Sequence, residues 1–437
     1  MSVSEEQACA PSTWYSGIKT RQWFVLAIAS AGWVFDVYEG QLFTVFKTSA
    51  LRDLLSQQGL SDPRVLAAAI DWHANVALAL FLIGGAVGGL GFGILGDRYG
   101  RVRVLSWTIL TYSVFSALTG FARNVWEVHL LRALVALGAG GEWAVAAALV
   151  AESFPPRARA FASGTFHASS VLGGALASLT GMYFVGPDSW RRAFLLGFAP
   201  ALLLLWIRLS LHEPGQWQKA KSESGTGHEL GSLAELLRDA QWRPRAFLAL
   251  GLAAVGLATY WGIFAWGPEL IGEVLGPDAS KETKQAAGSF AYLLMNLTGG
   301  LAGLLTFAPL ATWVGRRRAF AVYLVGAFVF SLVTFLGART HGQALVLLPV
   351  MAFFVVGLHA GYAVYFPELF PTRLRATGSS FGFNLGRLVG AAMLLVRGVL
   401  GASLGLRYAV VAMACLFIVG LVLLTCAPET RGQPLPD

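Results

Sequence analysis

Long apolar stretches recur along the whole chain and constrain its fold more than any other feature. A helix needs about 20 mainly apolar residues to cross roughly 30 Å of hydrocarbon, and twelve stretches of that kind can be traced here. Only 13% of the 437 residues are charged, against about a quarter in soluble domains. Too few charges remain to cover a water-soluble surface. The sequence therefore predicts an all-α integral membrane protein with twelve transmembrane helices.

The expected spans fall into two sets of six, separated by a polar segment. The first set is expected at residues 22–47, 70–95, 102–121, 126–150, 161–185 and 192–211. The second set is expected at residues 245–270, 284–310, 319–337, 343–366, 376–400 and 408–427. The chain is thus predicted to consist of a tail (1–21), a six-helix bundle (22–211), a linker (212–244), a second six-helix bundle (245–427) and a tail (428–437).

Basic residues gather in one of the two sets of loops. Loops richer in Lys and Arg face the cytoplasm, and the richer set here would carry the linker and both termini. We therefore expect a multi-pass protein of the plasma (inner) membrane with both termini in the cytoplasm. Its longest external loop is expected at residues 48–69. The net charge of +8 is spread in short groups between apolar runs, so nucleic acid is not an expected partner.

Two motifs recur in both halves at nearly the same offset. The segment ESFPPRAR at 152–159 matches ELFPTRLR at 368–375, and Gly-Arg at 100–101 matches Gly-Arg at 315–316. Parallel repeats of this kind bring substrate to the midplane, between the halves. The repeat predicts two pseudo-symmetric bundles of the same topology with a solute pathway between them.

Three motifs resemble the major facilitator superfamily, and the resemblance extends over essentially the whole chain. The run GILGDRYGRVR at 93–103 is similar to the family's loop signature between helices two and three. Arg132 followed by the glycines of 138–141 resembles the helix-four motif, and PETRG at 428–432 resembles the segment after helix twelve in sugar porters. The resemblance implies the major facilitator fold and a secondary active transporter that uses no cofactor.

Within this superfamily, three segments are most similar to sialate and carboxylate proton symporters. They are GGEW at 140–143, ESFP at 152–155 and NLGR at 384–387. The paired glutamines of helix seven in sugar porters are not evident near 259–264. This difference argues against a typical sugar porter.

Charged residues inside the expected spans are candidates for proton coupling. Each costs about 2.5–3.5 kcal/mol to insert and so needs a partner or a function. Asp36 and Arg132 are expected at the same depth and could form an ion pair. Burial disfavours the charged form of Asp36, whereas a nearby Arg132 favours the charged form, so Asp36 could exchange a proton. The alternative is a static ion pair that braces two helices. Glu39 shares the face of Asp36 and is either a second proton site or a vestibule carboxylate that reaches water.

Arg387 is the strongest candidate for a residue that binds substrate. It is expected close to the midplane in the second bundle, where its planar guanidinium could bind a carboxylate. Pairing with a backbone carbonyl or a protein acid is the alternative. Further polar and aromatic residues inside the spans could line the cavity or simply pack there. They are Glu142, Trp143, Tyr260, Trp261, Asn296, His359, Tyr362 and Asn384.

A third group of charges is expected at the cytoplasmic ends of the helices. The family resemblance implies that these residues form a gate which closes that side in the outward-facing state. They are Asp97, Arg98, Arg101, Glu152, Arg157, Arg159, Glu368, Arg373 and Arg375. In the second copy of the loop motif Thr312 and Trp313 replace Asp97 and Arg98, so that any latch there is expected to be incomplete.

Several familiar motifs of nucleotide-binding or metal-binding proteins are either absent from the sequence or lie where they cannot have that function. GFGILG at 91–96 matches the dinucleotide fingerprint but lies inside a span, without a preceding strand. Gly85, Gly89 and Gly93 instead share one helical face, which permits close packing. A Walker loop and an HExxH motif are absent from the sequence, and the three cysteines are scattered, so no enzyme activity, ATP-driven pump or metal site is predicted.

The sequence therefore predicts a proton-coupled symporter of a small organic acid or acidic sugar. Its partners would be the solute, protons and the lipid bilayer, and it would function as a monomer. A neutral sugar symporter and an exporter of drugs or metabolites are the alternatives within transport. The short linker and tails argue against a non-transporting sensor.

Overall fold

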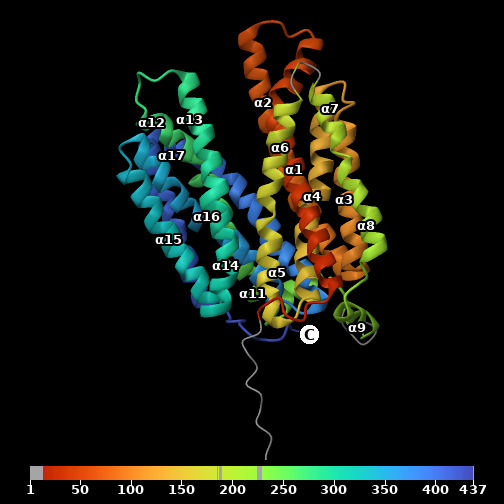
Figure 1. The fold of residues 1–437 in the computed structure, drawn as a ribbon. Coiled ribbons are helices and arrows are strands. Elements are labelled where there is room, and N and C mark those ends of the chain that lie inside the picture. The colour runs from red at the N-terminus through yellow and green to blue at the C-terminus, as the bar shows by residue number, and fades with distance from the viewer. Residues whose placement is uncertain (1–12, 185, 187–188, 224–228, 437) are drawn as a thin grey trace, which may run out of the picture.

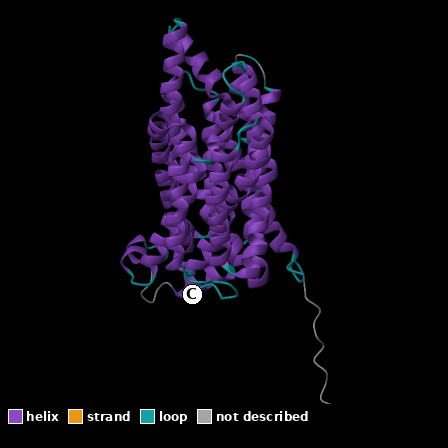
Figure 2. Ribbon diagram, turned by 90° about the vertical axis from the view of Figure 1, so that its left-hand side faces the viewer, coloured by secondary structure: helices purple, strands orange, loops and turns teal. Residues whose placement is uncertain are grey.

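The computed structural model describes residues 13–184, 186, 189–223 and 229–436. The first part of the expected N-terminal tail, with Cys9, lies outside the described residues. The other residues outside the description are 185, at the end of the expected fifth span, 187–188, which follow it, 224–228 in the linker, and 437 at the end of the chain. All regular secondary structure in the described chain is helical (Figure 2). The predicted all-α fold class is confirmed.

Each of the twelve expected spans corresponds to one helix or to consecutive helices. The first half contains α1 (Thr20–Gln57), α2 (Pro63–Tyr99), α3 (Arg101–Thr119), α4 (Val125–Ser153), α5 (Pro156–Ala168) with α6 (Ser170–Tyr183), and α7 (Ser189–Leu196) with η1 (Ala199–Leu202) and α8 (Leu203–Ser210). The linker contains α9 (Gly215–Glu223) and α10 (Leu233–Arg238).

The second half follows the same order. It contains α11 (Trp242–Gly262) with η2 (Phe264–Trp266) and α12 (Gly267–Val274), α13 (Lys281–Leu294) with η3 (Met295–Gly300) and α14 (Leu301–Val314), α15 (Arg316–Gly337), α16 (His341–Leu369), η4 (Thr372–Leu374) and α17 (Arg375–Thr425). The last helix supplies two spans because its backbone leaves the helical region at Gly405, where φ is 73°.

Nine helical segments of the described chain are long and apolar enough to cross a membrane by length and composition. The other three spans are α1, the α5–α6 pair and the first part of α17, and each carries charged residues. Asp36, Arg159 and Arg387 are among them. Charged side chains of this kind are tolerated where they face the interior of a helix bundle.

The predicted external loop at residues 48–69 is wrong. Helices α1 and α2 leave only residues 58–62 between them. Leu51, Leu54 and Leu55 recur at helical spacing on the end of α1 and are buried, so this stretch is an amphipathic helix. Its polar residues lower the mean hydropathy of the segment without ending the helix, which explains the error.

The two halves stand side by side and diverge toward one end (Figure 1). We call this the open end; it carries the α1–α2 and α12–α13 loops. The opposite end, where the halves meet near α9 and the described C-terminus, is called the closed end.

The halves pack closely where α2 meets α17. A side chain at Gly93 would place its Cβ 2.7 Å from the Cβ of Ser380, and one at Gly89 would overlap Asn384. Small residues allow two helix backbones to approach each other in lipid. The predicted packing role of this glycine face is therefore confirmed, and the face joins the two halves of the molecule.

Candidate functional site

A cavity of about 1220 Å³ lies between the two halves. Its wall begins near the α12–α13 loop, at Gly272 and Lys284, and continues inward to Phe383 and Arg387. Helices α1, α2 and α6 line one side, and helices of the second half line the other. A site with these walls can contact one solute from both halves at once.

Six of the predicted site residues line this cavity. They are Asp36, Tyr260, Trp261, Asn296, His359 and Arg387. Four further aromatic residues line it, Trp33, Phe81, Tyr292 and Phe383, and most of the remaining wall is aliphatic or small. Phe81 was not predicted, because residues 76–96 of α2 are uniformly apolar and give no signal that would have identified it. The site is a mainly apolar cavity with aromatic residues on both sides and four charged residues, Asp36, Glu269, Lys284 and Arg387.

Asp36 and Arg387 are opposite charges on opposite halves of the cavity. The side chain of Asp36 is buried, and its Oδ2 has no hydrogen-bond partner in the described part of the chain. Arg387 is half-buried, with its guanidinium carbon 5.0 Å from the centre of the Phe383 ring. The two charges attract each other electrostatically across the cavity. An anion that reaches Arg387 therefore enters the field of Asp36 as well.

The expected ion pair between Asp36 and Arg132 is not formed. Arg132 instead lies between the rings of Phe43 and Phe81, at 4.8 and 4.6 Å from their centres, and donates to the backbone carbonyl of Glu39 at 3.5 Å. The depth estimate from the sequence is too coarse to distinguish Asp36 from Glu39, which lies about one turn further along α1. Arg132 consequently interacts with the later residue.

Glu39 and Glu142 are buried behind the cavity. The Glu39 carboxylate accepts a hydrogen bond from Ser116 on α3, while its Oε1 has no partner in the described chain. Glu142 projects from α4 toward Gly32 of α1, where any side chain would clash with it. It lies beside Tyr112, and neither carboxyl oxygen makes a hydrogen bond of normal geometry to the described residues. We call Asp36, Glu39 and Glu142 the mid-bundle carboxylates.

The other predicted contact residues support the cavity from behind. Trp143 is fully buried, stacks on Phe383 with 4.0 Å between ring centres and donates from Nε1 to Nδ1 of His167 at 3.0 Å. The hydroxyl of Tyr362 donates to a backbone carbonyl of α11 at 2.9 Å, and Asn384 is buried against α2. His167, which the site prediction omits, lines the cavity. A neutral ring that accepts at Nδ1 carries its hydrogen on Nε2.

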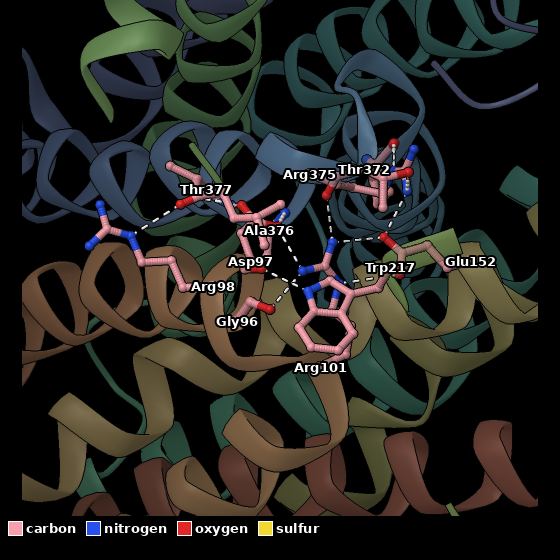
Figure 3. Close-up of polar contacts among 12 residues, drawn as sticks. Gly96, Asp97, Arg98, Arg101, Glu152, Trp217, Thr372, Arg375, Ala376 and Thr377 are labelled. Atoms are coloured by element: carbon pink, nitrogen blue, oxygen red, sulfur yellow. Dashed lines mark hydrogen bonds and ion pairs between the residues drawn. The ribbon is translucent and has the colours of Figure 1, made fainter. Parts of the chain in front are cut away.

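Four buried charges form a network at the closed end (Figure 3). We call Asp97, Arg101, Glu152 and Arg375 the closed-end network. Glu152 Oε1 accepts from Arg101 Nη2 at 2.9 Å and from Arg375 Nη1 at 2.7 Å, and its Oε2 accepts from Arg101 Nε at 3.2 Å. Because Arg375 belongs to the second half, Glu152 holds the two halves together.

Asp97 makes a second connection between the halves by capping α17 (Figure 3). Its Oδ1 accepts from the backbone N–H of Ala376 at 3.1 Å, and Oδ2 accepts from the backbone N–H and the hydroxyl of Thr377 at 2.8 and 2.6 Å. Arg101 Nη1 lies 2.9 Å from Oδ1 of the same carboxylate. An anion at a helix N-terminus satisfies free amides and the helix dipole. Helix α2 thus holds the start of α17.

Two capping glutamates were not predicted as site residues. Glu213 accepts backbone N–H groups of the first three residues of α3, and Glu429 accepts those of the first two residues of α15. Both helices follow a glycine with positive φ, 111° at Gly100 and 97° at Gly315. Glu213 and Glu429 are 216 positions apart, the offset of the 152–159 repeat, and this spacing is the signal that could have paired them.

Three further residues predicted to gate attach the tail and linker to the closed end. Arg98 donates to a backbone carbonyl in the linker at 3.1 Å, and Arg157 donates to a carbonyl of the N-terminal segment. Arg373 pairs with Glu235 of α10, with 2.8 Å between Nη2 and Oε1. These contacts brace the outer layer of the closed end.

The residues that the repeat relates to this network do not form a second set of contacts between the halves. Glu368 pairs with Arg316 of its own half, at 2.8 Å. Arg159 is related by the repeat to Arg375, but its Nε donates to a carbonyl of α4 at 3.1 Å. Thr312 occupies the position of the capping aspartate, and its hydroxyl donates within its own helix at 2.9 Å. The second half therefore lacks a capping carboxylate that would connect it to the first half, as the threonine at this position predicts.

Comparison with known proteins agrees with this architecture. Residues 23–394 match the family model of the Major Facilitator Superfamily. A probable 4-methylmuconolactone transporter of Cupriavidus pinatubonensis is 30% identical over 96% of this chain and 93% of its own. The cis,cis-muconate transport protein of Acinetobacter baylyi is 28% identical over 83% of this chain and 87% of its own. The solved proton:xylose symporter XylE has a similar fold, with a TM-score of 0.74 at 17% identity over 95% of this chain and 98% of its own.

Proposed function

This chain belongs to the major facilitator superfamily and is a multi-pass membrane transporter, and we propose that it carries a small organic anion together with protons. The cavity that both halves line supports alternating access, in which the halves rock about a bound solute. The units that rock are the bundles at residues 22–211 and 245–427. The observation that carries the proposal is the placement of Asp36 and Arg387 on opposite halves of this cavity.

The chemistry of the cavity favours an anion with a flat, apolar body. A guanidinium binds a carboxylate through two parallel hydrogen bonds, and Arg387 is the residue in position to do so. Aromatic rings around it stack on unsaturated groups more readily than they satisfy the hydroxyls of a sugar. The names of the two relatives, which refer to muconolactone and muconate, support the same class of substrate.

In this proposal, proton coupling follows from competition between Asp36 and the substrate carboxylate for Arg387. Without substrate, Arg387 stabilises the negative charge of Asp36 across the cavity. A bound carboxylate neutralises the guanidinium, which leaves Asp36 as a second anion in a site of low dielectric. Such a carboxylate becomes neutral by taking up a proton. Substrate binding and protonation of Asp36 therefore favour each other, which is the condition for symport.

The remaining residues have supporting roles in this proposal. Glu39 and Arg132 form the wall behind Asp36, and Glu142 connects α1 to the inner part of α4. The closed-end network keeps one side shut while the cavity is accessible from the other. We assign the closed end, with both termini, to the cytoplasm of the plasma (inner) membrane, because its loops are the richer in Lys and Arg. Each half of the pathway lies within one chain, which supports a monomeric transporter.

Uptake into proteoliposomes tests the proposal. Purified protein is reconstituted with a lumen one pH unit more alkaline than the bath, and uptake of labelled cis,cis-muconate is compared with that of xylose. We expect muconate to accumulate above equilibrium and to stop accumulating when a protonophore is added. Accumulation of xylose but of no organic acid would overturn the anion proposal, and muconate uptake that ignores the pH gradient would overturn the coupling.

A further inference from the structure

A second cavity, of about 640 Å³, lies at the closed end of the second half. It is bounded by the start of α15, the end of α17 and the segment that follows α17. Three arginines line it, Arg317, Arg318 and Arg431, and all three are exposed. This pocket is separate from the cavity between the halves and plays no part in the transport mechanism proposed above.

The arginines of this pocket outnumber the acidic groups beside them. The one carboxylate in its wall, Glu429, already accepts backbone N–H groups of Arg316, Arg317 and Arg431. The guanidinium of Arg317 makes one long contact, at 3.5 Å, with a backbone carbonyl at the end of α17. No ion pair joins Arg317, Arg318 or Arg431 to an acidic residue within the described ranges. The pocket therefore has a net charge of about +2 available to a ligand.

The rest of the wall is mainly aliphatic, with Thr425 as a further polar side chain. Leu421 and Leu424 of α17 and Ala321 of α15 line the side of the pocket that continues along the membrane-spanning helices. Trp313, directly before Val314 of the pocket wall, is 76% exposed. An exposed Trp at the end of a span is typical of the level of the lipid headgroups. Guanidinium groups thus meet an aliphatic surface at the depth where a phospholipid has its phosphate and the first part of its chains.

The internal repeat indicates that two of these arginines, Arg317 and Arg431, are not needed for the fold. At the offset of the loop motif, Val102 stands in the first half where Arg317 stands in the second. At the offset of the capping glutamates, Gly215 stands where Arg431 stands. The first half makes the same glutamate cap without either arginine. Arg103 stands where Arg318 stands, so the charges of Arg317 and Arg431 are the ones added in the second half.

We propose that this pocket binds the headgroup of an anionic phospholipid. The phosphate would lie among Arg317, Arg318 and Arg431, and one acyl chain would follow Leu421 and Leu424. Arginine is suited to phosphate because its planar fork offers parallel N–H donors. Basic pockets between transmembrane helices at the cytoplasmic surface bind anionic headgroups in the same way. A zwitterionic lipid with the same chains lacks the net charge that the pocket would neutralise.

Lipid retention and thermal unfolding of the purified full-length protein test this site. In detergent, dioleoyl phosphatidylglycerol is added at increasing concentration, with dioleoyl phosphatidylcholine and inorganic phosphate in parallel. We expect phosphatidylglycerol alone to raise the unfolding midpoint, by at least about 2 °C at saturation. Native mass spectrometry should retain phosphatidylglycerol at least about tenfold better than phosphatidylcholine. Equal retention of the two lipids would overturn the proposal, and an equal shift with free phosphate would overturn a lipid as the ligand.

Two variants separate this pocket from general electrostatics. The triple variant Arg317→Gln, Arg318→Gln, Arg431→Gln should lose both the retention and the shift. Its unfolding midpoint without lipid should stay within about 2 °C of the parent, because these exposed guanidinium groups make few contacts. Arg339→Gln removes an exposed arginine at the opposite end of α15 and should change neither result. Unchanged retention in the triple variant, or an equal loss in Arg339→Gln, would contradict the assignment.

Discussion

The closed-end network and the mid-bundle carboxylates are built from similar residues, yet they differ in how completely their charges are satisfied. In the network, both oxygens of Asp97 and of Glu152 accept hydrogen bonds. In the middle of the first half, Asp36 Oδ2 and Glu39 Oε1 have no partner in the described chain. Fully paired buried charges stabilise one arrangement of helices. A buried carboxylate that has an oxygen without a hydrogen-bond partner is instead more easily neutralised by a proton. We propose that this difference separates residues that hold one state from residues that respond to protons.

A second contrast lies within the closed end itself. The first half contributes a carboxylate that caps a helix of the other half, and the second half has Thr312 at the related position. Glu152 pairs across the halves, while Glu368 pairs within its own. The repeat has kept the glutamate and the arginines near these helix ends but not the aspartate, and only the first half contributes carboxylates that connect the halves. Opening of the closed end should therefore depend mainly on Asp97 and Glu152.

The largest effect is expected from Glu152→Gln. This change leaves Arg101 and Arg375 buried without their shared carboxylate, which costs about 3–5 kcal/mol when a buried pair is broken. The cost falls on the state in which the closed end is shut, so the population should shift toward opening there. Spin labels at Ser178 and Gln285, on opposite walls of the cavity, should move closer together.

Glu368→Gln is the matched control for this experiment. It removes the related carboxylate of the second half, which pairs with Arg316 inside the same half. We expect a lower unfolding temperature with an unchanged distance between the labels, measured after Cys9, Cys415 and Cys426 are replaced by serine. Equal distance changes in both variants would mean that the two halves of the closed end are equivalent.

Arg387→Ala should have the next largest effect. The variant removes charge-assisted hydrogen bonds to the anion worth about 1.5–3 kcal/mol, which corresponds to roughly 10- to 100-fold weaker binding. Equilibrium binding of labelled muconate to the detergent-solubilised protein measures this change. Arg339→Ala, at an exposed site outside the cavity, provides the control. Undiminished binding in Arg387→Ala would show that the anion is held elsewhere.

A moderate effect is expected from Asp97→Asn. An asparagine keeps the shape but removes the charge that faces Arg101 and the start of α17. The loss of a charged cap is worth about 1–2 kcal/mol, less than the loss of the carboxylate at Glu152. The same label distance should therefore shift only partly toward the shorter value. A shift as complete as that of Glu152→Gln would contradict the ranking of these two contacts.

The smallest effect, and of opposite sign, is expected from Thr312→Asp. The change supplies the missing capping carboxylate, opposite the start of α5, and should stabilise the shut closed end by about 0.5–1 kcal/mol. Transport turnover should fall slightly while the longer label distance becomes more populated. Thr312→Asn, which adds similar volume without the charge, should change the populations less. A shift toward the shorter distance would contradict the view that this latch is merely incomplete.

The sequence predicts the fold well because long apolar runs report directly on membrane spans, and the twelve helical segments lie close to the expected positions. The sequence does not predict contacts that depend on the depth of a residue to within one helical turn. Arg132 was therefore expected at Asp36 but lies at Glu39. Mean hydropathy also cannot reveal that α1 continues past residue 48, since buried leucines alternate there with polar residues. The cavity walls depend on which helices face each other, and that information lies in contacts between distant segments.

We propose that Asp36 exchanges the proton that drives uptake, and the whole transport mechanism depends on this residue. The most direct test compares the parent and Asp36→Asn in liposomes under imposed pH gradients, with Asp71→Asn, at an exposed aspartate of α2, as control. For one proton per anion, each pH unit provides about 1.4 kcal/mol and raises accumulation roughly tenfold. We expect this slope for the parent and the control, and no dependence on the gradient for Asp36→Asn, with exchange of external for internal substrate retained. Accumulation by Asp36→Asn that follows the gradient as in the parent would contradict the role of Asp36 in coupling.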